Sequence, residues 1–107
     1  MAIFQIAEYD VKPDAVARVK QAVQEFVHYV ETNEPGTLLY TAWQRQDDPA
    51  HFTHLFIFED DAAKETHGRS TAVKSFESVY SPELVGRVRF TNYDQVATNQ
   101  WLQTAAR

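Results

Sequence analysis

The sequence predicts an α+β fold in which a four-stranded antiparallel sheet carries its helices on one face, in the order β-α-β-β-α-β. Three observations support this prediction. Four segments show the residue alternation that is typical of strands, and they span residues 2–9, 37–45, 52–59 and 86–94. One long segment after the first strand carries an apolar stripe with helical spacing. The 107 residues, 44% of them hydrophobic, supply apolar material for one packed core.

The first strand and the first helix have the clearest patterns. Residues 2–9 place branched and aromatic side chains on both sides of an extended chain. Lys12-Pro13-Asp14 then opens a helix, because proline fits the first helical position and an acidic side chain fits the positive end of the helix dipole. Apolar residues follow at helical spacings to a predicted end near Thr32, and they are Val16, Val19, Val23, Phe26, Val27 and Val30.

The second and third strands are predicted to form a hairpin. Glu34-Pro35-Gly36 ends the helix, residues 37–45 form a strand, and the polar residues 46–50 turn the chain into residues 52–59. Both faces of these two strands are largely apolar, and the helices cover only one of them. A second copy of the chain, packed sheet against sheet, is therefore the predicted cover for the other face.

The second helix is predicted to be broken. Asp60 or Asp61 can cap a short helix that ends near His67, Gly68 interrupts it, and Ser70 or Thr71 can cap another helix that ends near Tyr80. With the fourth strand, these elements give a ferredoxin-like domain over residues 1–95.

Residues 96–107 form a C-terminal tail. Trp101 and Leu102 lie in it, and leaving two large apolar side chains in water is unfavourable. The tail is expected to pack on the body of the domain or on the dimer partner.

Charge and composition exclude several classes of function. A net charge of −5 and the absence of a Lys/Arg cluster argue against a nucleic acid or a membrane as the main partner. The absence of cysteine excludes disulfides and thiolate chemistry. The N-terminal residues lack the features of a signal peptide, and no apolar run is long enough to span a membrane, so a cytoplasmic location is expected.

Three of the four histidines lie between residues 51 and 67. His51 and His54, with a carboxylate such as Glu59, have the composition of a zinc or iron site. Residues three apart on a strand point to opposite faces, however, so these two imidazoles are not expected to converge and no metal site is predicted. His51 is interpreted as a turn residue in water.

The aromatic residues near His54 have two interpretations. His54, Phe56 and Phe58 share one face of their strand, so His54 either lines an aromatic cavity or is a half-buried residue with a local hydrogen-bond partner. Tyr40, Trp43, Phe56 and Phe58 can wall a flat pocket for aromatic rings, or they can fill the core. The sequence leaves both interpretations open.

Several short motifs resemble one protein family. They are NEPG followed by TLLY, the DDP turn followed by an aromatic residue, FEDDAAKETH, and VKSF. Together they are similar to the antibiotic biosynthesis monooxygenase family, dimeric α+β barrel proteins that include small quinol monooxygenases. This sequence departs from the family pattern at Phe56-Ile57-Phe58, where Glu-x-Trp is frequent, and at Lys64, where leucine is frequent.

The resemblance implies a cofactor-independent monooxygenase that oxidises a quinol or a polycyclic phenol with molecular oxygen. The family has a recurrent histidine at the position of His67, which would be the base. His54 would be an alternative base or a hydrogen-bonding partner, and the four aromatic residues would bind the substrate ring. No flavin, haem or nicotinamide motif is present, so no cofactor is expected.

Other functions compete with this one. A histidine at a helix C-terminus also stabilises the helix through its dipole, so His67 has a structural interpretation. The haem-degrading branch of the superfamily supplies an axial histidine from the later helix. This sequence has Glu77 there, which does not ligate haem iron as imidazole does, so haem degradation is disfavoured. The alternative outside enzymology is a non-catalytic, dimeric ligand-binding or stress-associated barrel that has kept the fold without the reaction.

Overall fold

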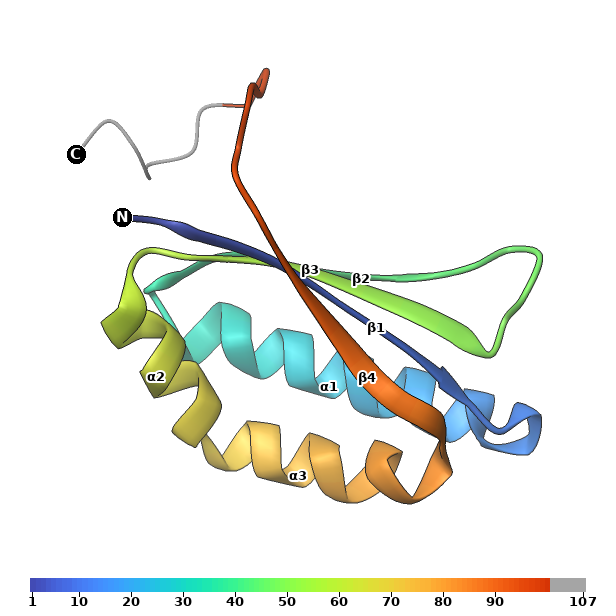
Figure 1. The fold of residues 1–107 in the computed structure, drawn as a ribbon. Coiled ribbons are helices and arrows are strands. Elements are labelled where there is room, and N and C mark those ends of the chain that lie inside the picture. Colours follow the sequence, from blue (N-terminus) through green and yellow to red (C-terminus); the bar gives the residue numbers. More distant parts are fainter. Residues whose placement is uncertain (101–107) are drawn as a thin grey trace.

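The computed structural model describes residues 1–100 (Figure 1). The strands are β1 (Ile3–Val11), β2 (Thr37–Gln44), β3 (His51–Phe58) and β4 (Leu84–Tyr93). The helices are α1 (Val16–Asn33), α2 (Asp61–Arg69) and α3 (Thr71–Tyr80). Short 3-10 turns, Pro13–Ala15 and Ser81–Glu83, precede α1 and follow α3.

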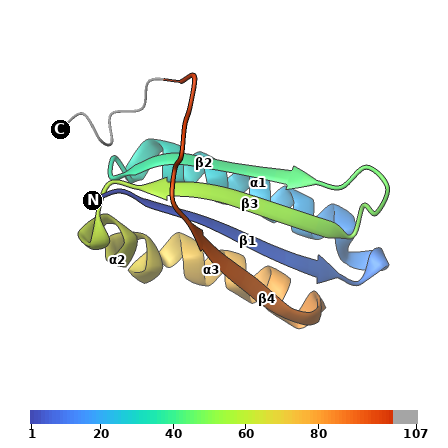
Figure 2. The same cartoon turned by 45° about the horizontal axis from the view of Figure 1, so that its top comes forward.

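The four strands form one antiparallel sheet in the order β2-β3-β1-β4 (Figure 2). All three helices lie on the same face of this sheet (Figure 1). The predicted ferredoxin-like α+β fold is therefore confirmed. In the middle of the sheet His54 of β3 lies between Ala42 of β2 and Ala7 of β1, and this row of side chains faces the helices.

The break between α2 and α3 lies two residues after the predicted position. Gly68 is inside α2, and the chain turns at Ser70, whose backbone is extended with a ψ of 148°. The Ser70 hydroxyl accepts a hydrogen bond from the Val73 backbone N–H, so this side chain caps α3. Asp60 caps α2 in the same way, because its carboxylate accepts from the Ala63 N–H. Capping side chains thus set both helix starts.

The core lies between the helices and the sheet. Apolar residues of α1 and α3 pack against the inner face of β1 and β3, and the buried members include Tyr9, Val11, Val19, Phe26, Phe52 and Phe76. Phe26 and Phe76 stack with ring centroids 5.1 Å apart, which ties α1 to α3. The two long helices therefore form one wall opposite the sheet.

The other face of the sheet is partly exposed. Trp43 of β2 is 58% exposed and Tyr93 of β4 is 52% exposed. After β4 the chain passes over to this face (Figure 1), where Thr98 and Gln100 line a pocket together with Ile57. Trp101 and Leu102, which the sequence places in the packing tail, lie outside the described residues. No helix in residues 1–100 has the length and apolar character to cross a membrane.

Candidate functional site

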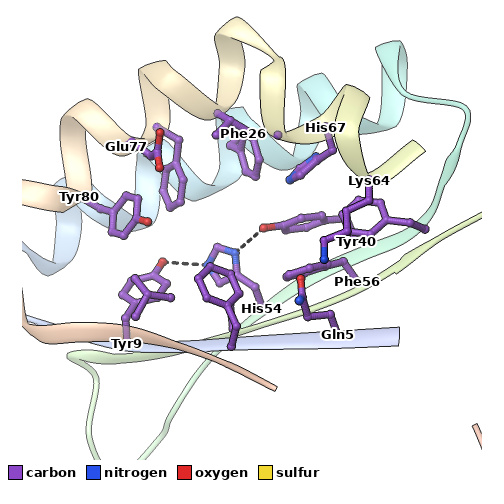
Figure 3. A pocket seen from close by; sticks show the side chains of 17 residues that line it. Gln5, Tyr9, Phe26, Tyr40, His54, Phe56, Lys64, His67, Glu77 and Tyr80 are labelled. Atoms are coloured by element: carbon purple, nitrogen blue, oxygen red, sulfur yellow. Dashed lines mark hydrogen bonds between the residues drawn. The ribbon is translucent and has the colours of Figure 1, made fainter. Parts of the chain in front are cut away.

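A cavity of about 290 Å³ opens between the helices and the inner face of the sheet. This volume is at the lower end of the roughly 300–1,000 Å³ that small-molecule sites occupy. Most of its wall consists of aromatic and imidazole rings (Figure 3), contributed by Tyr9, Phe26, Tyr40, His54, Phe56, Phe58, His67, Phe76, Tyr80 and Phe90. Such a lining favours a planar apolar ligand with a few polar atoms.

His67 is held by a buried carboxylate. Its Nδ1 donates to Oε1 of Glu34 at 2.7 Å, and the same oxygen accepts from the Thr37 hydroxyl at 3.0 Å. Glu34 is only 6% exposed, and its Oε2 is buried with no hydrogen-bond partner among residues 1–100. Because Nδ1 carries the donated hydrogen, Nε2 of a neutral His67 carries the free lone pair. No residue in the described chain forms a hydrogen bond with this Nε2.

The turn after α1 brings Glu34 to His67. The Glu59 N–H donates to the Gly36 carbonyl at 2.8 Å, which ties the turn to the end of β3. A Cβ atom on Gly36 would lie 2.7 Å from the Cβ of Ala63 in α2. Glycine therefore lets the turn approach α2 closely, and this approach sets Glu34 beside His67.

His54 is held between two tyrosine hydroxyl groups. The Tyr9 hydroxyl lies 2.8 Å from Nε2, and the Tyr40 hydroxyl lies 2.8 Å from Nδ1 (Figure 3). Burial lowers the pKa of His54 from 6.5 to about 4, because the charged imidazolium loses its hydration there. Burial also raises the pKa of Tyr9 and of Tyr40 well above 10. All three groups are therefore neutral near pH 7.

The two imidazoles differ in what they can do chemically. His54 is uncharged, and both of its ring nitrogens are already hydrogen-bonded. His67 offers a free ring nitrogen at the cavity wall and has a carboxylate on its other nitrogen, the arrangement by which proteins stabilise an imidazole that accepts a proton. The geometry therefore favours His67 over His54 as a general base.

The structure brings together five of the six residues that the sequence analysis predicts as site residues. Tyr40, His54, Phe56, Phe58 and His67 all line the cavity. Tyr40 stacks on Phe56 with ring centroids 5.1 Å apart, so the two rings form one flat wall. Trp43 is the exception, because it points from β2 to the opposite face of the sheet and does not line this cavity.

His51 was expected in water, and this expectation is wrong. It is 9% exposed, because β3 begins at this residue and places it against β1. Its ring nitrogens lie 2.9 Å from Oδ1 of Asp10 and 3.3 Å from Oε1 of Glu8. His54 faces the helices, whereas His51 and these carboxylates lie on the other face, which confirms the predicted divergence of the two histidines. No group of three or more His, Asp or Glu side chains in residues 1–100 is arranged to hold a metal ion.

Two polar residues of the site are not predicted from the sequence. The local pattern predicts only a strand position for Tyr9, although Tyr9 alternates with Ala7 and Val11 on the buried face. The local pattern of Glu34 predicts a turn, and nothing in it indicates a partner 33 residues away. Lys64, noted as a departure from the family pattern, lies at the cavity wall together with Glu77 (Figure 3).

Several solved structures share this fold. A proposed antibiotic biosynthesis monooxygenase from Caulobacter crescentus CB15 has 22% identity and a TM-score of 0.83, with 90% of this chain and 91% of that chain covered. A proposed member from Bacteroides thetaiotaomicron VPI-5482 has 17% identity and a TM-score of 0.87, with 95% and 96% covered. A further antibiotic biosynthesis monooxygenase has 25% identity and a TM-score of 0.82, with 91% and 100% covered.

The comparisons at the level of sequence give a family match, although a search of curated proteins finds no significant match. Residues 2–78, which include β1 to β3, α1, α2, His54, His67 and most of α3, match the family described as antibiotic biosynthesis monooxygenase. The chain therefore belongs to the antibiotic biosynthesis monooxygenase family.

Proposed function

We propose that this protein is a cofactor-independent monooxygenase that oxidises a quinol or a polycyclic phenol with molecular oxygen. The observation that carries the proposal is the His67–Glu34 pair, which presents a free imidazole nitrogen to an aromatic cavity. Family membership supports the reaction class, and the cavity supports a small aromatic substrate.

In the proposed reaction His67 takes the proton of the phenolic hydroxyl through Nε2. The carboxylate of Glu34 stabilises the positive charge that develops on the imidazole. The resulting phenolate is rich enough in electrons to reduce oxygen directly, and this electron transfer forms a radical pair. The aromatic walls keep water away from the pair. One oxygen atom forms a new bond to a ring carbon and the other leaves as water. The substrate supplies the two hydrogen atoms of that water and all four electrons, so no outside reductant is needed.

Oxygen uptake by purified, metal-free protein tests the proposal. The substrates are a panel of quinols and anthrone-like phenols, and no cofactor is added. With ¹⁸O₂ the expected product carries one labelled oxygen atom. Spontaneous oxidation is the competing process. It makes hydrogen peroxide, so catalase lowers its net oxygen uptake and leaves a true monooxygenation unchanged. Product without label, or no uptake above the protein-free rate with any substrate, would contradict the proposal and favour a binding protein.

We also propose that the protein is a homodimer joined through the exposed sheet face. Trp43 and Tyr93 lie on this face and are more than half exposed in the single chain. Large exposed aromatic groups on one face are typical of an interface between subunits. The cytoplasmic location expected from the sequence stays a prediction, which cell fractionation checks.

A further inference from the structure

The hydrogen atoms around His54 are more numerous than its hydrogen bonds. A neutral imidazole carries one N–H and one lone pair, and each tyrosine hydroxyl carries one hydrogen. Three hydrogen atoms therefore serve two hydrogen bonds, Tyr9 to Nε2 and Tyr40 to Nδ1. His54 must donate to one tyrosine and accept from the other. The tyrosine that accepts keeps a hydroxyl hydrogen that neither bond uses.

This remaining hydrogen has no acceptor in the described chain. Neither hydroxyl forms another hydrogen bond within residues 1–100. Both tyrosines line the cavity, and Tyr9 is only 2% exposed. A buried hydroxyl hydrogen without an acceptor is unfavourable, so an acceptor atom placed in the cavity would be bound there.

We propose that Tyr9, His54 and Tyr40 form a hydrogen-bond relay that donates to an acceptor oxygen of the bound ring, either a quinone carbonyl or a phenolate. With its hydrogen on Nδ1, the His54 imidazole donates to the Tyr40 hydroxyl, and the Tyr40 hydroxyl hydrogen is free to bind the ligand. With its hydrogen on Nε2, the imidazole donates to the Tyr9 hydroxyl, and the Tyr9 hydroxyl hydrogen is free. The position of the ligand oxygen thus selects the tautomer of His54. The relay rests on the proposed function for the ligand class, an aromatic oxygen compound.

Burial keeps the relay in one charge state. The lowered pKa of His54 and the raised pKa values of the two tyrosines leave all three groups neutral, so tautomer exchange moves hydrogens without creating charge in the cavity. The tyrosines would contact the ligand, whereas His54 acts through them and is a positioning residue.

Nuclear magnetic resonance of the wild-type protein tests the relay directly. The probes are 1,4-naphthoquinone, which has two acceptor oxygens, and naphthalene, which has the same rings and none. The chain has no cysteine, so the quinone meets no thiol. In protein labelled with ¹⁵N histidine, the signals lost in His54→Gln identify His54. The quinone is expected to shift the two ring-nitrogen signals of His54 in opposite directions, toward a single tautomer. Naphthalene is expected to leave these signals unchanged. Equal responses to both probes, or quinone binding without this change, would overturn the relay.

Binding measurements on variants give a second test. Replacing both tyrosines by phenylalanine, Tyr9→Phe with Tyr40→Phe, removes the hydroxyl donors and keeps the rings. Affinity for the quinone should fall about tenfold, the scale of a lost hydrogen bond, while naphthalene affinity stays. Tyr80→Phe is the matched control, because Tyr80 lines the same cavity and does not bond to His54. An unchanged quinone preference in the double variant, or an equal loss in Tyr80→Phe, would contradict the proposal.

The outcomes separate this inference from the proposed enzyme activity. Tautomer selection by the quinone without any substrate-dependent oxygen uptake supports the relay and contradicts the proposed monooxygenase activity. Oxygen uptake without tautomer selection supports the enzyme activity and contradicts the relay. If the double variant does not fold, naphthalene binding is lost too, and the wild-type resonance experiment decides.

Discussion

His67 Nδ1 lies 2.7 Å from Oε1 of Glu34, both side chains are largely buried, and His67 lines an aromatic cavity. The pair joins α2 to the turn that follows α1. Two functions are compatible with it, since the carboxylate can orient a catalytic imidazole or merely fasten α2 to the body. The two functions predict different results for the same substitutions.

His67→Ala is expected to lower substrate-dependent oxygen uptake by about a hundredfold or more, because it removes the general base. A purely structural role predicts instead a loss of about 3–5 kcal/mol in the free energy of unfolding with turnover nearly intact, because the buried Glu34 carboxylate loses its histidine partner. Oxygen uptake and chemical denaturation of the same variant check both quantities. His28→Ala on the exposed side of α1 is the control and should change neither. A destabilised but fully active His67→Ala protein would refute the catalytic assignment.

Glu34→Gln should lower turnover at least about tenfold while the fold is kept. The amide has nearly the same shape and can still accept from His67, but it lacks the negative charge that stabilises the protonated imidazole. Thr37→Val is the matched control, because it removes the other donor to the same Glu34 oxygen and leaves the charge. Steady-state kinetics compare the two. Equal losses in both variants would show that the hydrogen-bond network matters and the charge does not.

Stability should fall as the pH is lowered from about 6.5 to about 4, because of His54. In the unfolded chain this imidazole takes up a proton below pH 6.5, whereas burial delays protonation in the folded chain to about 4. The unfolded state therefore binds more protons in this window, and the free energy of unfolding loses about 3 kcal/mol across it. Urea titrations at several pH values measure the slope. His54→Gln should flatten the slope, and His28→Ala should not; a steep slope that survives in His54→Gln would assign it to other groups.

Gly36→Ala is expected to reduce stability by about 1–3 kcal/mol, because the new methyl group would lie 2.7 Å from the Cβ of Ala63. The displaced turn should also separate Glu34 from His67 and lower turnover. Gly68→Ala is the opposite case: nothing lies within 4 Å of a Cβ there, and the residue is inside α2. Alanine should stabilise that helix by up to about 1 kcal/mol. Thermal unfolding of the two variants compares them directly, and equal effects would contradict the packing argument.

Trp43→Glu is expected to dissociate the proposed dimer. The side chain is 58% exposed in the single chain, so the substitution should leave the monomer folded while it puts a charge into the interface. Light scattering should give about twice the 12.3 kDa chain mass for the wild type and the chain mass for the variant. Gln21→Glu makes the same charge change at an exposed position of α1 and should remain a dimer. A monomeric wild type at micromolar concentration would exclude the dimer.

The sequence alone predicted the element order and the residues on each strand face. Those features depend on local rules, namely the alternation of side chains along a strand and the apolar stripe of α1. The same rules placed His54, Phe56 and Phe58 on one face of their strand, whereas the predicted pocket wall was wrong at Trp43, which lies on the other face of the sheet. The predicted cap at Ser70 is confirmed, whereas the predicted interruption at Gly68 is wrong, because the break between α2 and α3 follows this capping side chain rather than the helix weakness of glycine.

The polar chemistry of the cavity was decided by tertiary structure. Glu34 meets His67 across 33 residues, and Tyr9 meets His54 across 45, because sheet register and helix packing bring distant segments together. A carboxylate in a turn and a tyrosine on a strand have the same local pattern whether or not a histidine lies beside them. Only the packed fold, which buries these groups and leaves each with few possible partners, determines which imidazole is held neutral between two hydroxyls and which one faces the cavity with a free nitrogen.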